Sequence, residues 1–395
     1  MESSELTALL TPDGLRMLAE MPPVRSSADV ARTVSTLRAA GHSPELVSAL
    51  VGQARLREKA GAKFGDLAHR MLFTRAGLEQ ATRMSVASLH AGRFRNAGAT
   101  RVADLGCGIG GDALGLAGLG LHVAAVDADE ITAAIAAYNL APFGDAVTVA
   151  HGRAEDQDLS GIDAVWLDPA RRTAGRGETS RTRHDEWSPS LEWVFDLVRR
   201  RPVGVKLGPG LDRDVIPEDV EAQWVSADGS TIELVLWSKH LARQGVRRAA
   251  LVTRGDQAWE ITAGADAEDA PVRDLGAFVH EPDGAVIRAR LIGDVARSLD
   301  AGMLDPRIAY LTSDVALTSP FVSSFRVREE LPPDTKALAR ALRARRIGRL
   351  EIKKRGVDVD PAALRTSLKL RGEDSATLLL TRVGETRRAI LAERV

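Results

Sequence analysis

The chain has 395 residues, of which 44% are hydrophobic and 27% are charged, and its formal net charge is −1 at pH 7, values that suit two or three domains with their own cores. Cys107 is the single cysteine, which excludes an internal disulfide and a zinc site built from cysteines. Apolar runs stay below membrane length, and Glu2 and Glu5 stand where a signal peptide would carry lysines, so we expect a cytoplasmic protein.

Residues 1–95 lack strand patterning and predict a helical N-terminal domain. The clearest helix start is Ser43-Pro44-Glu45, where a capping residue, a first-turn proline and an early acid precede an apolar face. We expect this domain to lead into the α/β fold that follows it.

Residues 96–240 alternate short apolar strands with helices, which predicts a doubly wound, seven-stranded Rossmann-like sheet of the α/β class. The first strand runs into the turn Gly106-Cys107-Gly108-Ile109-Gly110, where glycines let backbone amides approach a ligand closely. Asp127 ends the second strand about twenty residues later, where an acid accepts both hydrogen bonds from a ribose diol. Together the turn and the acid predict a nucleoside ligand.

Asp104 precedes the first glycine, so the motif reads D-x-G-C-G-x-G-G-D and differs from the dinucleotide pattern G-x-G-x-x-G. A carboxylate there repels a pyrophosphate and attracts a cation, such as the amino group or the sulfonium of S-adenosyl-L-methionine. The stretch resembles the first motif of the class I S-adenosylmethionine-dependent methyltransferases. Asp168-Pro169-Ala170-Arg171, after the fourth strand, resembles their D-P-P-Y catalytic motif, with alanine and arginine in the last two places.

That resemblance implies that Asp168 and the backbone after it orient an exocyclic amine, so that its lone pair faces the methyl group. Pro169 belongs to the same motif, and Arg171 replaces the aromatic residue, where it would stack on a base or grip a phosphate. Lys206 ends the fifth strand near the expected site and is a further candidate for substrate contact.

Two further cofactor positions follow from resemblance. Class I enzymes often carry Gly-Asp-Ala after the third strand, and its acid receives the adenine amino group; here Gly152-Arg153-Ala154 precedes Glu155, to which we move that role. The segment 78–87 is similar to the trimethylguanosine synthase group, in which a helical lead-in closes over the cofactor. This likeness implies that Thr82 lies at the cofactor pocket.

Residues 241–330 predict a β-rich connecting module, and residues 331–395 predict a compact α+β domain. Between Lys336 and Val395, 16 Lys and Arg stand against 7 Asp and Glu, an excess that suits a polyanion. The segments 347–356 and 368–372 resemble the THUMP-like domain found behind bacterial methyltransferases, and THUMP domains bind RNA. The residues expected to hold RNA are Lys353, Lys354, Arg355, Lys369 and Arg371.

The sequence therefore predicts an S-adenosyl-L-methionine-dependent enzyme that N-methylates a base amino group in structured RNA, with tRNA and rRNA as the first candidates. A metal is not expected, because the histidines lack paired ligand spacing and amine methylation needs no Lewis acid. A membrane partner is not expected, because the apolar runs are too short. Three alternatives stay open. They are a DNA amino-methyltransferase, an inactive protein that binds cofactor or RNA, and an enzyme acting on a small molecule or a protein.

Overall fold

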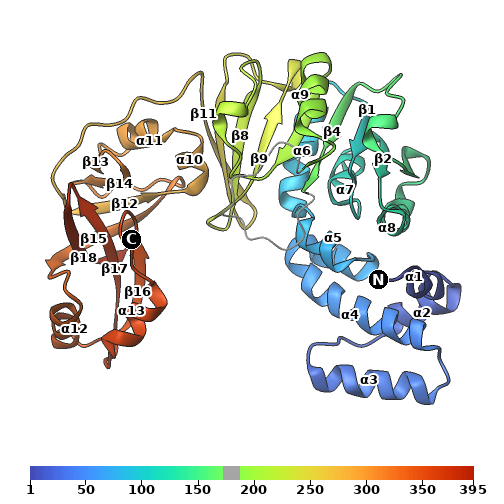
Figure 1. Ribbon diagram of the computed structural model, residues 1–395, viewed down its shortest axis with the longest axis horizontal. Helices are drawn as coiled ribbons and strands as arrows, with labels where there is room; N and C mark the ends of the chain where they lie inside the picture. The colour runs from blue at the N-terminus through green and yellow to red at the C-terminus, as the bar shows by residue number, and fades with distance from the viewer. Residues whose placement is uncertain (172–186) are drawn as a thin grey trace. The chain divides into compact units, whose positions relative to one another are not determined.

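The computed structural model (Figure 1) describes residues 1–171 and 187–395. This part of the chain divides into two compact units. The first unit consists of Met1–Leu207, Pro217–Val220 and Leu236–Ala242. The second consists of Gly208–Ile216, Glu221–Val235 and Arg243–Val395.

Helices occupy the first 96 residues, which confirms the predicted helical lead-in. They are α1 (Ser3–Leu9), α2 (Pro12–Glu20), α3 (Ser27–Ala39), α4 (Pro44–Phe64), the 3₁₀ segment η1 (Gly65–Arg70), α5 (Arg75–Gln80) and α6 (Met84–Asn96). The Ser43 hydroxyl accepts a hydrogen bond from the Leu46 amide at 3.3 Å, and Pro44 occupies the first turn of α4. The start of α4 therefore uses the capping chemistry that its sequence predicts.

Five parallel strands form one half of the first sheet, in the spatial order β3, β2, β1, β4 and β7, with β3 at the edge. Their bounds are β1 (Arg101–Leu105), β2 (His122–Asp127), β3 (Val147–His151), β4 (Ala164–Leu167) and β7 (Val203–Leu207). The connections include α7 (Gly111–Gly118), α8 (Glu130–Leu140) and α9 (Leu191–Arg200). Residues 102–105 of β1 are all buried, as expected of a central parallel strand. This is the doubly wound arrangement, in which ligands bind at the carboxyl ends of the strands.

The sheet has nine strands in the described residues, where the sequence predicts seven. The additional members follow β8 (Glu221–Ala227) and β9 (Ser230–Trp237), and they are β10 (Arg248–Arg254) and β11 (Gln257–Ala263). Positions 249–253 of β10 are buried, and β10 pairs in parallel with β8 on one side and antiparallel with β11 on the other. Strands β10 and β11, which we expected to belong to the separate β-rich module of residues 241–330, thus extend this sheet, and the more exposed β11 is its edge.

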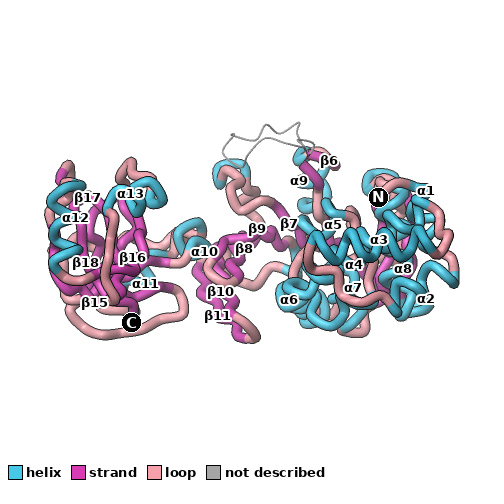
Figure 2. The backbone as a smooth tube through the Cα atoms, turned by 90° about the horizontal axis from the view of Figure 1, so that it is seen from below, coloured by secondary structure: helices cyan, strands magenta, loops and turns pink. Residues whose placement is uncertain are grey.

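A second sheet has the strand order β13-β14-β12-β15-β18-β17-β16. These strands are β12 (Phe278–Pro282), β13 (Gly302–Asp305), β14 (Ile308–Ser313), β15 (Val322–Leu331), β16 (Ile347–Lys354), β17 (Asp374–Val383) and β18 (Thr386–Arg394). Helices α12 (Thr335–Ala344) and α13 (Pro361–Leu368) lie beside this sheet (Figure 2). They supply Leu338, Leu342 and Leu368 to a buried cluster with Leu350 and Leu378. The predicted C-terminal α+β region therefore shares one sheet with the strands that precede it.

The remaining elements are short. They are η2 (Ala141–Ala146), η3 (Ala154–Asp156), β5 (Ala170–Arg171), β6 (Trp187–Ser188), η5 (Arg213–Val215), η6 (Lys239–Leu241), α10 (Gly284–Arg288) and α11 (Ile292–Ser298). Across the described ranges, none of the helices has the length and apolar character needed to cross a membrane.

Candidate active site

The glycine turn joins β1 to α7 and lies against the end of β2. The amides of Gly106 and Cys107 both donate to the Val126 carbonyl, at 2.8 and 3.0 Å. The φ angles of Gly106, Gly108 and Gly110 are +84°, +55° and +89°, in the left-handed region that side chains disfavour. Gly110 is also the residue that caps the N-terminus of α7. The three glycines therefore have backbone angles that residues with a side chain seldom adopt.

Asp127 is held in place by the backbone on both sides. Its Oδ2 accepts from the Gly108 amide and its Oδ1 from the Asp129 amide, each at 2.9 Å. Burial raises the pKa of Asp127, and these two hydrogen bonds act in the opposite direction. The acid predicted to receive a ribose is thus fixed directly beside the glycine turn.

Asp104 is buried at the end of β1, and neither carboxylate oxygen has a hydrogen-bond partner among the described residues. Burial, and then the negative charges of Asp112 and Asp168, raise the pKa of the Asp104 carboxyl well above its ordinary value. A buried carboxylate in such surroundings is stabilised by a cation. The Asp104 carboxylate therefore fits a ligand that carries a positive charge.

Asp168 follows β4 directly, next to the glycine turn. Its amide donates to the Leu105 carbonyl at 3.2 Å, and a Cβ at Gly106 would lie 2.8 Å from the Asp168 carbonyl oxygen. Pro169 is buried, and the backbone of Ala170 and Arg171 pairs with β6. The Arg171 side chain, to which we assigned a catalytic role, lies outside the described part.

A chain of polar contacts connects Asp168 with the helical lead-in. The Lys206 ammonium, at the end of β7, lies 2.6 Å from Asp168 Oδ2 and donates to the Thr82 hydroxyl at 3.1 Å. That hydroxyl in turn donates to Asp112 Oδ2 at 2.7 Å. On the other side, His90 Nδ1 lies 3.1 Å from Asp112 Oδ1.

Thr82 and Lys206 were expected near the site from the sequence, but no connection between them was predicted, and Asp112 and His90 had no predicted role. Burial raises the pKa of Asp112, yet hydrogen bonds from His90 and Thr82 and the charge of Lys206 outweigh burial and leave it lowered. The sequence feature that could have pointed to Asp112 is its position as an acid in the first turn of α7, directly after the glycines.

Lys63, on α4, fixes the segment that carries Thr82. Its ammonium donates to the carbonyls of Leu78, Glu79 and Ala81 at 2.7–2.8 Å. These carbonyls lie at the C-terminal end of α5, where a cation is favoured. Burial, and then the positive charges of Lys206 and Arg83, lower the pKa of Lys63 to about 8.

Asn139, on α8, joins the lead-in to the glycine turn. Its Oδ1 accepts from the Leu72 amide at 2.7 Å, while its Nδ2 donates to the carbonyls of Leu72 and Ile109 at 3.0 and 2.9 Å. Ile109 belongs to the turn, and a Cβ at Gly77 on α5 would lie 2.5 Å from its side chain. The lead-in is therefore packed directly on the turn.

Glu155 lies in η3, after β3. Its carboxylate forms an ion pair with Arg153 at 2.9 Å, and the Gly152 amide donates to the Asp127 carbonyl at 2.9 Å. The segment that carries Glu155 is thus attached to the end of β2, and Arg153 would have to share the carboxylate with any ligand.

The residues expected to hold RNA differ in their surroundings. Lys353 lies 2.6 Å from Glu281 Oε2, and Arg355 lies 3.5 Å from the other oxygen of the same carboxylate. Lys354, Lys369 and Arg371 are exposed. Only part of the predicted positive charge is therefore directed to solvent at these positions.

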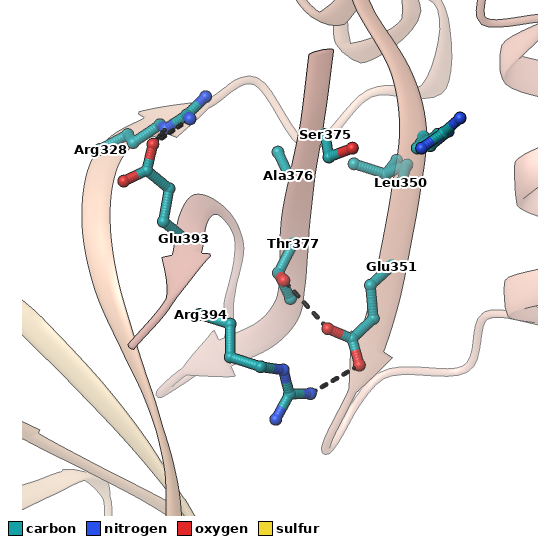
Figure 3. A pocket seen from close by; sticks show the side chains of 9 residues that line it. Arg328, Leu350, Glu351, Ser375, Ala376, Thr377, Glu393 and Arg394 are labelled. Atoms are coloured by element: carbon teal, nitrogen blue, oxygen red, sulfur yellow. Dashed lines mark hydrogen bonds and ion pairs between the residues drawn. The ribbon is translucent and has the colours of Figure 1, made fainter. Parts of the chain in front are cut away.

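The second unit also contains a groove of about 650 Å³ on its sheet (Figure 3). Two carboxylates in it are engaged: Glu393 pairs with Arg328, while Glu351 pairs with Arg394 at 2.8 Å and accepts from Thr377 at 3.0 Å. The remaining lining residues are Arg349, Leu350, Ser375 and Ala376. The groove thus presents guanidinium groups and hydroxyls together.

The parallel sheet, the glycine turn and the acid that ends β2 define a nucleoside-binding α/β protein of the Rossmann-like class. The chain is 35% identical over 346 residues to an uncharacterized S-adenosylmethionine-dependent methyltransferase of Mycobacterium tuberculosis, in strains CDC 1551 and H37Rv, covering 85% of this chain and 92% of the relative. The chain therefore belongs to the S-adenosylmethionine-dependent methyltransferases, and its cofactor is S-adenosyl-L-methionine.

Other comparisons concern the domains and the fold. Residues 322–394 match the family described as THUMP domain-like, and residues 2–60 match a domain of unknown function (DUF8688). A crystal structure described as a "putative methyltransferase" from Porphyromonas gingivalis W83 is similar at a TM-score of 0.70 and 20% identity, covering 94% of this chain and 99% of that chain. The predicted methyltransferase with a C-terminal THUMP-like region is confirmed. In the residues that the structure describes, no group of three or more His, Cys, Asp or Glu side chains is arranged to hold a metal ion.

Proposed function

We propose that this methyltransferase transfers a methyl group to an amino group on a base of RNA, with Asp168 orienting the amine. The observation that carries the proposal is the position of Asp168, whose main chain is hydrogen-bonded to the last residue of β1 and lies against Gly106. An acid beside the cofactor turn is where an amine that receives a methyl group needs an acceptor.

The cofactor fits the residues at the carboxyl ends of β1 and β2. Asp104 is a buried carboxylate that a positive charge would stabilise. Apart from its chain neighbours, no heavy atom of the described residues lies within 4 Å of a Cβ built on Gly108, so there is space beside Asp127. The bound cofactor supplies a methyl group on a positively charged sulfur. The residues that we assign to it are Asp104, Gly106, Gly108, Gly110, Asp127, Glu155 and Thr82.

Asp168 acts on the amine in this proposal. By accepting a hydrogen bond from the amino group, its carboxylate directs the nitrogen lone pair away from the acid. The methylated nitrogen then carries one proton too many, and the same carboxylate is positioned to accept it. Pro169 restricts the backbone after the acid, and Arg171 takes the place of the stacking residue.

The RNA assignment rests on charge in the second unit. The exposed Lys354, Lys369 and Arg371 would meet phosphates, while Lys353 and Arg355 share the charge of Glu281. The groove on the sheet of this unit adds Arg349, one of its lining residues. The match of residues 322–394 to the THUMP-like family supports the same partner class.

The test is the transfer of labelled methyl from S-adenosyl-L-methionine to separate pools of RNA, DNA and protein. The proposal predicts label in RNA that disappears in Asp168→Ala and persists in Asp156→Ala, which removes an exposed acid of the same unit. Cofactor binding is measured for all three proteins, so that lost transfer is separated from lost binding. Label confined to DNA or protein, or binding without label in any pool, contradicts the proposal.

A further inference from the structure

Lys206 is placed opposite Asp168 by the register of the sheet. β4 and β7 pair in parallel with Leu167 opposite Val205, so the next residue of each strand also meets at the carboxyl edge. The Lys206 side chain is only 12% exposed and its ammonium lies 2.6 Å from Asp168 Oδ2. A charge this deeply buried requires a paired charge, and Asp168 supplies one.

Lys206 is itself held from a second direction. The Thr82 hydroxyl has one proton, which it donates to Asp112, so its oxygen accepts from the Lys206 ammonium. Asp112 is buried and is held in turn by His90, whose ring packs on Trp166 at a centroid distance of 4.5 Å. The ammonium is therefore tied to a rigid part of the core.

This arrangement differs from a surface ion pair, in which both side chains move freely and the energy gained is small. Here α6, α7 and β7 each supply one member of the chain that ends at the Asp168 carboxylate. Such support is what a carboxylate needs in order to keep one orientation toward a reacting group.

We propose that Lys206 is a positioning residue, which orients the Asp168 carboxylate for the substrate amine and is itself anchored through Thr82 and Asp112. The inference rests on the proposed function, because it assigns Lys206 a role through Asp168. It also gives the helical lead-in a part in the reaction, since Thr82 belongs to the segment held by Lys63.

The test begins with Lys206→Met, which removes the ammonium and keeps an apolar stem. We expect kcat to fall by about 10- to 100-fold, as for a misplaced catalytic group, while the Kd for the cofactor changes little. The unfolding midpoint also falls, because Asp168 and Asp112 lose a neighbouring positive charge, so kcat is compared at a temperature where both proteins are folded. Lys206→Arg restores a cation that can pair with the carboxylate, and we expect it to recover at least part of the lost kcat. Thr82→Val removes the anchor and changes a residue that we also assign to the cofactor. Its kcat is therefore measured at saturating S-adenosyl-L-methionine, where we expect a smaller loss than for Lys206→Met.

A double-mutant cycle shows whether Lys206 acts through Asp168. With Asp168→Asn as the second substitution, Lys206→Met causes little further loss if the two act as a unit. The inference is contradicted if the fold-losses in kcat of the two single variants multiply in the double variant. It is also contradicted if Lys206→Met leaves kcat unchanged, or if Lys206→Arg is no more active than Lys206→Met. An Asp168→Asn enzyme as active as the wild type refutes the proposed function instead, so the two failures are distinguished.

Discussion

Replacing Gly106 by alanine adds one methyl group where the ends of β1 and β4 meet. The new Cβ would lie 2.8 Å from the Asp168 carbonyl oxygen, which is backbone and cannot move aside as a flexible side chain does. The φ of +84° adds the cost of a left-handed residue, about 1–2 kcal/mol. Overpacking adds about 1–3 kcal/mol, so we expect a loss of about 2–5 kcal/mol in the free energy of unfolding.

Gly108→Ala is the matched control for this prediction. Its φ of +55° carries the same conformational cost of about 1–2 kcal/mol, but the described residues leave the space around the new methyl group open beyond its chain neighbours. That space lies beside Asp127, where we place the cofactor. Gly108→Ala should therefore be more stable than Gly106→Ala. Its affinity for S-adenosyl-L-methionine should nevertheless be at least about tenfold weaker than that of the wild type, a difference of about 1.4 kcal/mol.

Both substitutions are measured by urea unfolding, followed by tryptophan fluorescence, and by calorimetric titration with the cofactor. The steric reasoning is wrong if Gly106→Ala is no less stable than Gly108→Ala. The placement of the cofactor is wrong if Gly108→Ala binds it as tightly as the wild type.

Three other substitutions test separate parts of the account. Asp104→Asn should stabilise the free protein at neutral pH, because burial raises the pKa of the Asp104 carboxyl. The wild type therefore loses stability as the pH rises from the pKa of this carboxyl in the unfolded chain to its pKa in the folded protein. The loss is about 1.4 kcal/mol for each pH unit between the two values. The gain should vanish in unfolding curves at low pH, and the variant should bind the cofactor more weakly; a destabilised variant contradicts this. Asn139→Ala leaves the Leu72 and Ile109 groups without their partner, and we expect urea unfolding to show a loss of about 2–4 kcal/mol, whereas a loss below about 1 kcal/mol would be inconsistent with those bonds. Arg349→Ala should weaken RNA binding and reduce the slope of log affinity against log salt concentration by about one. Arg38→Ala, in α3, is the control and should change neither quantity. If both variants have the same effect, the groove is not part of the surface that binds RNA.

The core of the candidate site could be predicted because its signals are local. Asp104 and the glycine turn lie within one strand–turn–helix unit, Asp127 is the last residue of β2, and Asp168 follows the buried β4. Parallel strands bring their carboxyl ends to one edge, so the topology alone predicts that these acids meet.

The Lys206 chain could not be predicted in the same way. Thr82, His90 and Asp112 reach it from the lead-in, from α6 and from α7, and their contacts depend on how these helices pack. Each residue alone has an ordinary explanation: Asp112 as an acid in the first turn of a helix, and His90 as a buried residue within one.

The charge of the C-terminal segment shows a similar limit. Counting residues from 336 to 395 gives a strong excess of Lys and Arg, but Glu281, which pairs with Lys353 and Arg355, comes from β12 outside that count. The strand count failed because pairing of β10 with β8 is a long-range contact, for which the apolar run 249–253 was the only sign.

The measurement that tests the central claim most directly is mass spectrometry of nucleosides from RNA incubated with the protein and labelled S-adenosyl-L-methionine, beside the same reaction with Asp168→Ala. The account predicts a labelled base methylated on an exocyclic nitrogen, present with the wild type and absent with the variant. Label on a ribose oxygen or a ring carbon, or a labelled product that persists in Asp168→Ala, would contradict it.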